Sequence, residues 1–141
     1  MDRAYFDLYG VPTQLTDKEI SWFLEVCEIC KEATGIDVEI TCKIHDWLPG
    51  KAKEALGVIY TDGDRFWITI DTYFIHECYE EKFNGGFNLA FEDLYHVIAH
   101  ELAHITQWRH CKRHTKITED LYAKIMAYQD KDKGTLEYLL K

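Results

Sequence analysis

The sequence predicts one α+β domain over residues 1–141, and three observations support this fold class. A chain of 141 residues has the length of a single domain. Hydrophobic residues make up 47% of the chain, enough to form a core, and two prolines mark no linker at which the chain would divide. Segments with helical periodicity come before and after segments that alternate as strands do, which favours a mixed fold.

The first predicted element is a helix that follows Thr16. Thr16 and Glu19 have the spacing of a capping box, and Gly35 is typical of a helix end. Between them the apolar residues recur at helical spacing: Ile20, Phe23, Leu24, Cys27 and Cys30. The two cysteines form a C-x-x-C motif without a second pair, so we expect core packing there. The five cysteines are an odd number, and we expect free thiols.

The middle of the chain predicts a small, mainly antiparallel sheet. Residues 38–44 alternate between apolar and polar side chains, as in a half-buried strand, and residues 47–50 predict a turn. Residues 56–60 and 65–70 predict a hairpin, in which Asp62-Gly63 would supply the positive φ values of a tight turn. Aromatic side chains in and after this hairpin are expected to cover the sheet, and they are Phe66, Trp67 and Tyr73.

Two further helices are predicted after the sheet. Asn88 would cap a long helix with Glu92 and Asp93 in its first turn. Its apolar ridge consists of Leu94, Ile98, Leu102 and Ile105. The last helix is predicted over about 118–128, and a polar break at 130–134 separates it from a short terminal element.

The motif His100-Glu101-Leu102-Ala103-His104 lies in the predicted second helix. Residues four apart lie on one face of a helix, so His100 and His104 could bind one zinc ion. Glu101 is turned about 100° around the helix, which suits a general base that takes a proton from zinc-activated water and passes it to a leaving amine. His96, one turn earlier, is expected to line the cleft without binding the metal.

A catalytic zinc site needs a third protein ligand and one open position. The segment after the helix offers three candidates. His114 is the preferred one, because the following helix could fold back and direct its first residues at the metal. His110 has the six-residue spacing of a metzincin-type site, and Glu119 would give a gluzincin-like site. Spacing alone leaves these alternatives open.

The charge of the chain is unevenly distributed. The net charge is −9, with −11 over residues 1–95 and +2 over residues 96–141. Overall acidity disfavours a surface that binds nucleic acid or an anionic membrane throughout. Arg109, Lys112 and Arg113 form a basic lip beside the expected zinc site, which could receive a phosphate or an acidic segment. No long apolar run or leader-like start is seen, so we expect a cytoplasmic protein without a membrane partner.

The motif, its flanking run 97–108, the order of elements and the late histidine resemble the SprT-like zinc metalloprotease domain. The resemblance is strongest over residues 16–128. It implies a zincin-like fold with an N-terminal helix, a small sheet, an active-site helix and a further C-terminal helix. It also implies Zn²⁺ held by His100, His104 and His114, with Glu101 as the base. Zincins generally bind substrate as an added strand, and residues 65–71 are the expected edge.

The expected function is therefore that of a zinc metallopeptidase that hydrolyses protein or peptide substrates. Some SprT-like proteases cleave proteins crosslinked to DNA, and the basic lip could meet such a DNA-associated substrate. The alternative is a zinc-stabilised binding module for a protein or DNA partner, without turnover, such as a phage or anti-defence protein. A weaker alternative is a nuclease that uses His100, His104 and His110.

Overall fold

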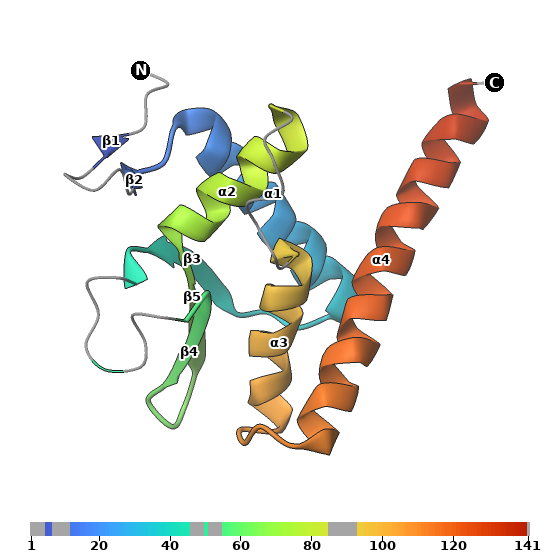
Figure 1. The fold of residues 1–141 in the computed structure, drawn as a ribbon. Coiled ribbons are helices and arrows are strands. Elements are labelled where there is room, and N and C mark those ends of the chain that lie inside the picture. Colours follow the sequence, from blue (N-terminus) through green and yellow to red (C-terminus); the bar gives the residue numbers. More distant parts are fainter. Residues whose placement is uncertain (1–4, 7–11, 46–49, 51–54, 85–92, 141) are drawn as a thin grey trace.

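The computed structural model describes residues 5–6, 12–45, 50, 55–84 and 93–140. Four helices and two small sheets make up this part of the chain (Figure 1). The helices are α1 (Asp17–Thr34), α2 (Thr72–Phe83), α3 (Leu94–Thr106) and α4 (Lys112–Leu140). The strands are β1 (Tyr5–Phe6), β2 (Pro12–Gln14), β3 (Glu39–Lys43), β4 (Gly57–Thr61) and β5 (Phe66–Asp71). The predicted α+β class is confirmed.

The main sheet is mixed, which corrects the expectation of a mainly antiparallel one. Its strand order is β3-β5-β4, in which β5 pairs parallel to β3 and antiparallel to β4. The segment between β3 and β5 contains β4, and it is long enough for the crossover that a parallel pair needs. The expected substrate edge at residues 65–71 is therefore wrong, because β5 is the central strand and β4 lies at the edge beside α3.

The hairpin between β4 and β5 forms as expected, but its turn differs from the predicted one. Thr61 pairs with Phe66, which leaves a connection of four residues between the strands. Only Gly63 has a positive φ in this connection, at 98°. The Asp62 side chain instead accepts hydrogen bonds from the backbone N–H groups of Asp64 and Arg65, at 3.0 and 2.9 Å. The preceding turn predicted at 47–50 lies outside the described residues, except for Gly50.

The expected capping signals of α1 are all present. Thr16 accepts a hydrogen bond from the Glu19 backbone at 3.1 Å, and the Glu19 carboxylate accepts one from the Thr16 backbone at 3.0 Å. Gly35 ends the helix with φ of 72°. The other carboxylate oxygen of Glu19 lies 2.7 Å from Nδ1 of His76 on α2. The capping box therefore also joins α1 to α2.

The later helices differ from their predicted bounds. Helix α2 was not predicted, although Asp71 caps it by accepting a hydrogen bond from the Phe74 backbone. Helix α3 is capped by Asp93 rather than by Asn88, which lies outside the described residues. Helix α4 begins at Lys112 and continues through the segment 130–134 that was expected to break it. One helical glycine in this segment costs only about 1 kcal/mol, which a long helix tolerates.

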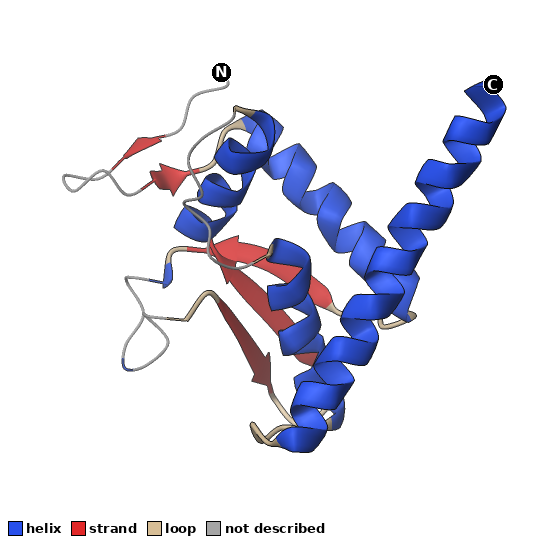
Figure 2. Cartoon of the chain, turned by 45° about the vertical axis from the view of Figure 1, so that its right-hand side comes forward, coloured by secondary structure: helices blue, strands red, loops and turns tan. Residues whose placement is uncertain are grey.

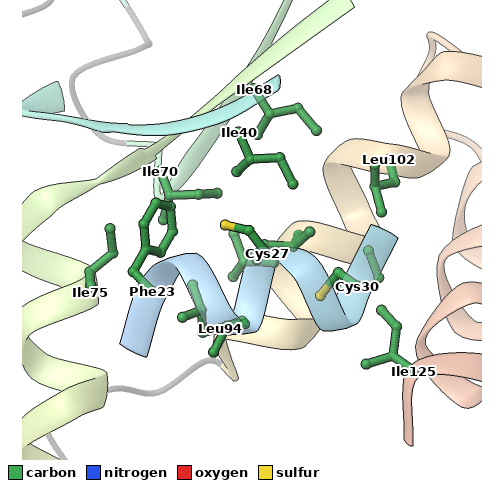
Figure 3. Close-up of a cluster of buried hydrophobic side chains, with 14 of the residues drawn as sticks. Phe23, Cys27, Cys30, Ile40, Ile68, Ile70, Ile75, Leu94, Leu102 and Ile125 are labelled. Atoms are coloured by element: carbon green, nitrogen blue, oxygen red, sulfur yellow. The ribbon is translucent and has the colours of Figure 1, made fainter. Parts of the chain in front are cut away.

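The core lies between the main sheet, α1 and α3, with α2 and α4 at its two ends (Figures 2 and 3). Its largest fully buried apolar side chains include Phe23, Ile68, Ile70, Ile75, Leu94, Ile98, Leu102 and Ile125. Cys27 and Cys30 are buried in this core, as expected, and burial raises the pKa of the Cys27 thiol to about 12. All five cysteines are free. Within the described residues, no helix has the length and apolar character that crossing a bilayer requires.

Candidate metal centre

Three histidines from two helices meet at one point. His100 and His104 lie four residues apart on α3, and His114 lies in the first turn of α4. Their ligand atoms all lie within 4.8 Å of one another, and the rings of His104 and His114 are stacked at 4.1 Å. Figure 1 shows why they meet, since α3 and α4 run side by side after a short connection. This cluster could hold a metal ion.

The position of His114 follows from the buried face of α4. Over residues 112–129, the buried side chains of this helix recur at spacings of four, three and four, and they are His114, Thr118, Leu121 and Ile125. His114 therefore begins the stripe that packs against the rest of the molecule. We expected it just ahead of a helix that starts near 118, so its place inside the helix is a correction.

Backbone carbonyls define which nitrogen of two rings remains available to a metal. Nδ1 of His104 lies 3.2 Å from the Gln107 carbonyl oxygen, so Nδ1–H donates there and Nε2 keeps its lone pair. Nε2 of His114 lies 3.0 Å from the His100 carbonyl oxygen, which leaves Nδ1 of His114 as the available atom. Such outer contacts orient metal-binding imidazoles.

The electrostatics of the cluster also suit a cation. Desolvation, followed by the neighbouring His114, His104 and His110, lowers the pKa of His100 to about 4. Desolvation and His114 likewise lower the pKa of His104. Both rings are therefore neutral at pH 7, the form in which imidazole binds a metal. A set of three imidazoles fits Zn²⁺ and also other transition metals such as Cu, Fe and Ni.

Glu101 lies beside this cluster in a cleft of about 610 Å³ between α3 and the edge strand β4. The side chain is 6% exposed, and desolvation raises its pKa to about 7. A carboxyl group with this pKa can both accept and donate a proton near neutral pH. Of the described residues that line the cleft, Glu101 alone has a carboxylate. The structure therefore brings the expected base next to the expected metal ligands.

No family model, curated protein or solved structure matches this chain. The resemblance to SprT-like domains therefore stays a prediction based on the motif and the order of elements. The geometry of the cluster supports a metal site independently of that resemblance.

The remaining candidates lie around the cluster with different roles. Nε2 of His96 lies 2.9 Å from Oε1 of Glu119, and the Glu119 side chain is 59% exposed. Glu119 therefore contacts His96 and does not belong to the histidine cluster, and His96 lines the cleft as expected. His110 lies on the connection between α3 and α4, and its Nε2 is 3.2 Å from Nε2 of His100 and 3.0 Å from Nε2 of His104.

The basic lip lies on the same connection and on the start of α4. Arg109, Lys112 and Arg113 are all exposed, as is neighbouring Trp108, whose side chain is 51% exposed. The Trp108 ring lies 6.3 Å from that of Phe66 and 6.1 Å from that of His104. The lip therefore borders the cleft, which Trp108 and His110 line.

Gly57 is a site residue that the sequence did not reveal. An added Cβ at this position of β4 would lie 3.0 Å from Cγ of Glu101, 3.1 Å from Cγ1 of Val97 and 3.2 Å from Cδ1 of Ile70. A glycine at a strand position without positive φ can indicate such a close approach. Here the missing side chain leaves the space that Glu101 occupies.

We expect Gly57→Ala to destabilise the fold by about 1–3 kcal/mol, because the added methyl group overpacks the contact with Glu101. Metal binding by the histidines should persist, because none of their atoms is among the nearest contacts of the added Cβ. Urea unfolding and metal titration of the purified variant measure both effects. Val58→Ala is the control, since its side chain points to the opposite face of β4. Unchanged stability of Gly57→Ala would contradict this prediction.

We also expect Glu101 to make the metal-free protein less stable as pH rises. The carboxyl group keeps its proton to about pH 7 in the native state, but loses it near its ordinary pKa of 4.5 when unfolded. The native state therefore binds more protons between these values, and the loss reaches about 3 kcal/mol above pH 7. His100 has the opposite effect. Because its pKa is lowered to about 4, it makes the native state more stable as pH rises from 4 to 6.5.

The comparison with Glu101→Gln separates these two opposing effects. Urea unfolding in the presence of a chelator should show that the variant gains stability relative to the wild type from pH 5 to pH 8. An identical difference at the two pH values would contradict burial of an ionisable carboxyl group at this position.

Proposed function

We propose that this chain is a zinc metallopeptidase. The observation that supports the proposal is a cluster of three histidines next to one buried carboxyl group, at a cleft beside a strand edge. His100, His104 and His114 would hold the metal. The chemistry that zinc supplies when bound is polarisation of the scissile carbonyl and acidification of a water molecule.

Glu101 performs the proton transfers in this mechanism. The carboxylate takes a proton from the attacking water as its oxygen bonds to the carbonyl carbon of the substrate. The same group then donates that proton to the amide nitrogen as the C–N bond breaks. In the metal-free protein, burial raises the pKa of this group to about 7, and a carboxyl group that titrates near neutral pH suits both steps. The neighbouring Gly57 allows the side chain to stay in the cleft.

The substrate would lie along β4. Residues Leu56 to Ile59 line the cleft opposite α3, and β4 is an edge strand of the main sheet. An extended peptide could pair with such an edge through backbone hydrogen bonds, which need no particular side chains. This placement would direct a peptide carbonyl past the histidine cluster. Proteins or peptides are therefore the proposed substrate class, and zinc the proposed metal.

A proteome-derived peptide library tests this proposal. The zinc-loaded protein and the same protein with a chelator are incubated with the library, and new amino termini are quantified by mass spectrometry. We expect new termini only in the zinc-loaded sample. A protein that binds one equivalent of zinc but generates no new termini would contradict peptidase activity.

A zinc-stabilised binding module is the second candidate, favoured by the position of His110 close to two of the other histidines. A fourth nitrogen there would complete a closed, structural site. The exposed basic lip would then contact an acidic protein or DNA partner. Reversal of Arg109, Lys112 and Arg113 to Glu should abolish retention of labelled DNA or an acidic peptide, whereas Glu101→Gln should not. Equal retention by both variants would exclude this function of the lip.

A further inference from the structure

His110 lies on a loop, unlike the three histidines of the cluster. His100 and His104 are fixed on α3 and His114 on α4, whereas His110 belongs to the short connection between these helices. Its side chain is exposed, while those of His104 and His114 are buried. Nevertheless, its Nε2 lies within 3.2 Å of Nε2 of both α3 histidines.

Hydrogen bonding alone explains this arrangement poorly. Nε2 of His110 carries at most one hydrogen, so it cannot donate a well-aligned hydrogen bond to His100 and to His104 together. Metal coordination explains it better. With Zn–N bonds of about 2.0–2.1 Å, two nitrogens of a tetrahedral site lie about 3.3 Å apart. The observed separations of 3.2 and 3.0 Å are close to that value.

We propose that His110 is a fourth, exchangeable ligand that closes the metal site in the resting protein. The inference rests on the proposed metal site and concerns its regulation. Four protein ligands leave no open position at a tetrahedral zinc, so the closed form is latent. Release of His110 opens the position that hydrolysis needs.

The surroundings of His110 identify it as the ligand that exchanges. Departure of His100, His104 or His114 would require movement of a helix, and two of these rings also contact backbone carbonyls. Departure of His110 requires movement only of the connection around 108–111, whose side chains at Trp108, Arg109 and Cys111 are exposed. His110 and Trp108 both line the cleft with β4. A peptide that enters along β4 would therefore meet this connection and displace the histidine.

The cobalt-substituted protein tests the proposal through its coordination rather than its activity. Wild type and His110→Ala are each loaded with one equivalent of Co²⁺, and acetohydroxamate is titrated while the visible spectrum is recorded. X-ray absorption on the same samples should give four imidazoles in the wild type and three in the variant. If His110 is bound in at least nine molecules of ten, acetohydroxamate should bind the variant about tenfold more tightly or better.

The controls separate this proposal from the others. Cys111→Ala changes an exposed side chain of the same connection and should behave as the wild type. Equal acetohydroxamate affinity in wild type and His110→Ala would overturn the proposal. Loss of cobalt from His110→Ala would also overturn it, because His110 would then be a permanent structural ligand. The expected change in coordination without peptide hydrolysis in either protein would uphold the exchangeable ligand and contradict the peptidase function alone.

Discussion

Glu101→Gln is expected to lower kcat/KM for peptide hydrolysis by a factor of about 10²–10⁴, the usual contribution of a general acid–base group. Glutamine has nearly the shape of the protonated carboxyl group, so it fits the space that Gly57 leaves. It cannot accept a proton from water or return one to the leaving amine. The histidines are unchanged, and the variant should still bind one equivalent of zinc.

Glu119→Gln provides the matched control for this prediction. Glu119 is a second carboxylate near the cleft, but it is mostly exposed and pairs with His96. Its replacement should leave kcat/KM within a few-fold of the wild type. Hydrolysis and zinc content are measured on the same preparations of all three proteins. Persistence of activity in metal-replete Glu101→Gln would show that another group transfers the proton, and the proposed mechanism would then be wrong.

The features that the sequence predicts well depend on residues close together in the chain. The capping box at Thr16 and Glu19, the helix end at Gly35 and the placement of His100, Glu101 and His104 on one helix are all observed. Each of these depends on contacts within about one helical turn, where fixed helix geometry determines which groups meet.

The features that the sequence does not determine depend on contacts between distant segments. The alternation of β5 shows that it is a strand, but not that it lies in the centre of the sheet. The close approach of Gly57 to Glu101 joins positions 44 residues apart, and the glycine has no local reason visible in the chain. Helix α2 did have a local signal, since Asp71 precedes buried Ile75 and Cys78 at helical spacing.

The third metal ligand shows the same limit. Spacing from His104 could not distinguish His110, His114 and Glu119, because the connection between two helices can close in several ways. The buried stripe from His114 through Ile125 carried the missing information, as it sets where α4 begins and which face packs inward. The structure then brings both His110 and His114 to the cluster and pairs Glu119 with His96.

Replacement of His100, His104 or His114 with alanine is expected to weaken zinc binding by more than about 100-fold, since even loss of an outer-shell partner costs 10–100-fold. His96→Ala is the matched control. It removes another cleft histidine of α3, one turn away, whose Nε2 lies 2.9 Å from Oε1 of Glu119. This variant should retain zinc with nearly unchanged affinity.

Thermal unfolding with and without zinc measures this difference within each variant, so any destabilisation from the substitution itself cancels. Free zinc at about 1,000 times Kd stabilises a native binding site by about 4 kcal/mol, which should raise Tm by about 10 °C. The wild type and His96→Ala should show this shift, and the three ligand variants should show no more than about a third of it. A full shift in His114→Ala would remove His114 from the ligand set. The short distances of His110 to His100 and His104 would then make it the third ligand.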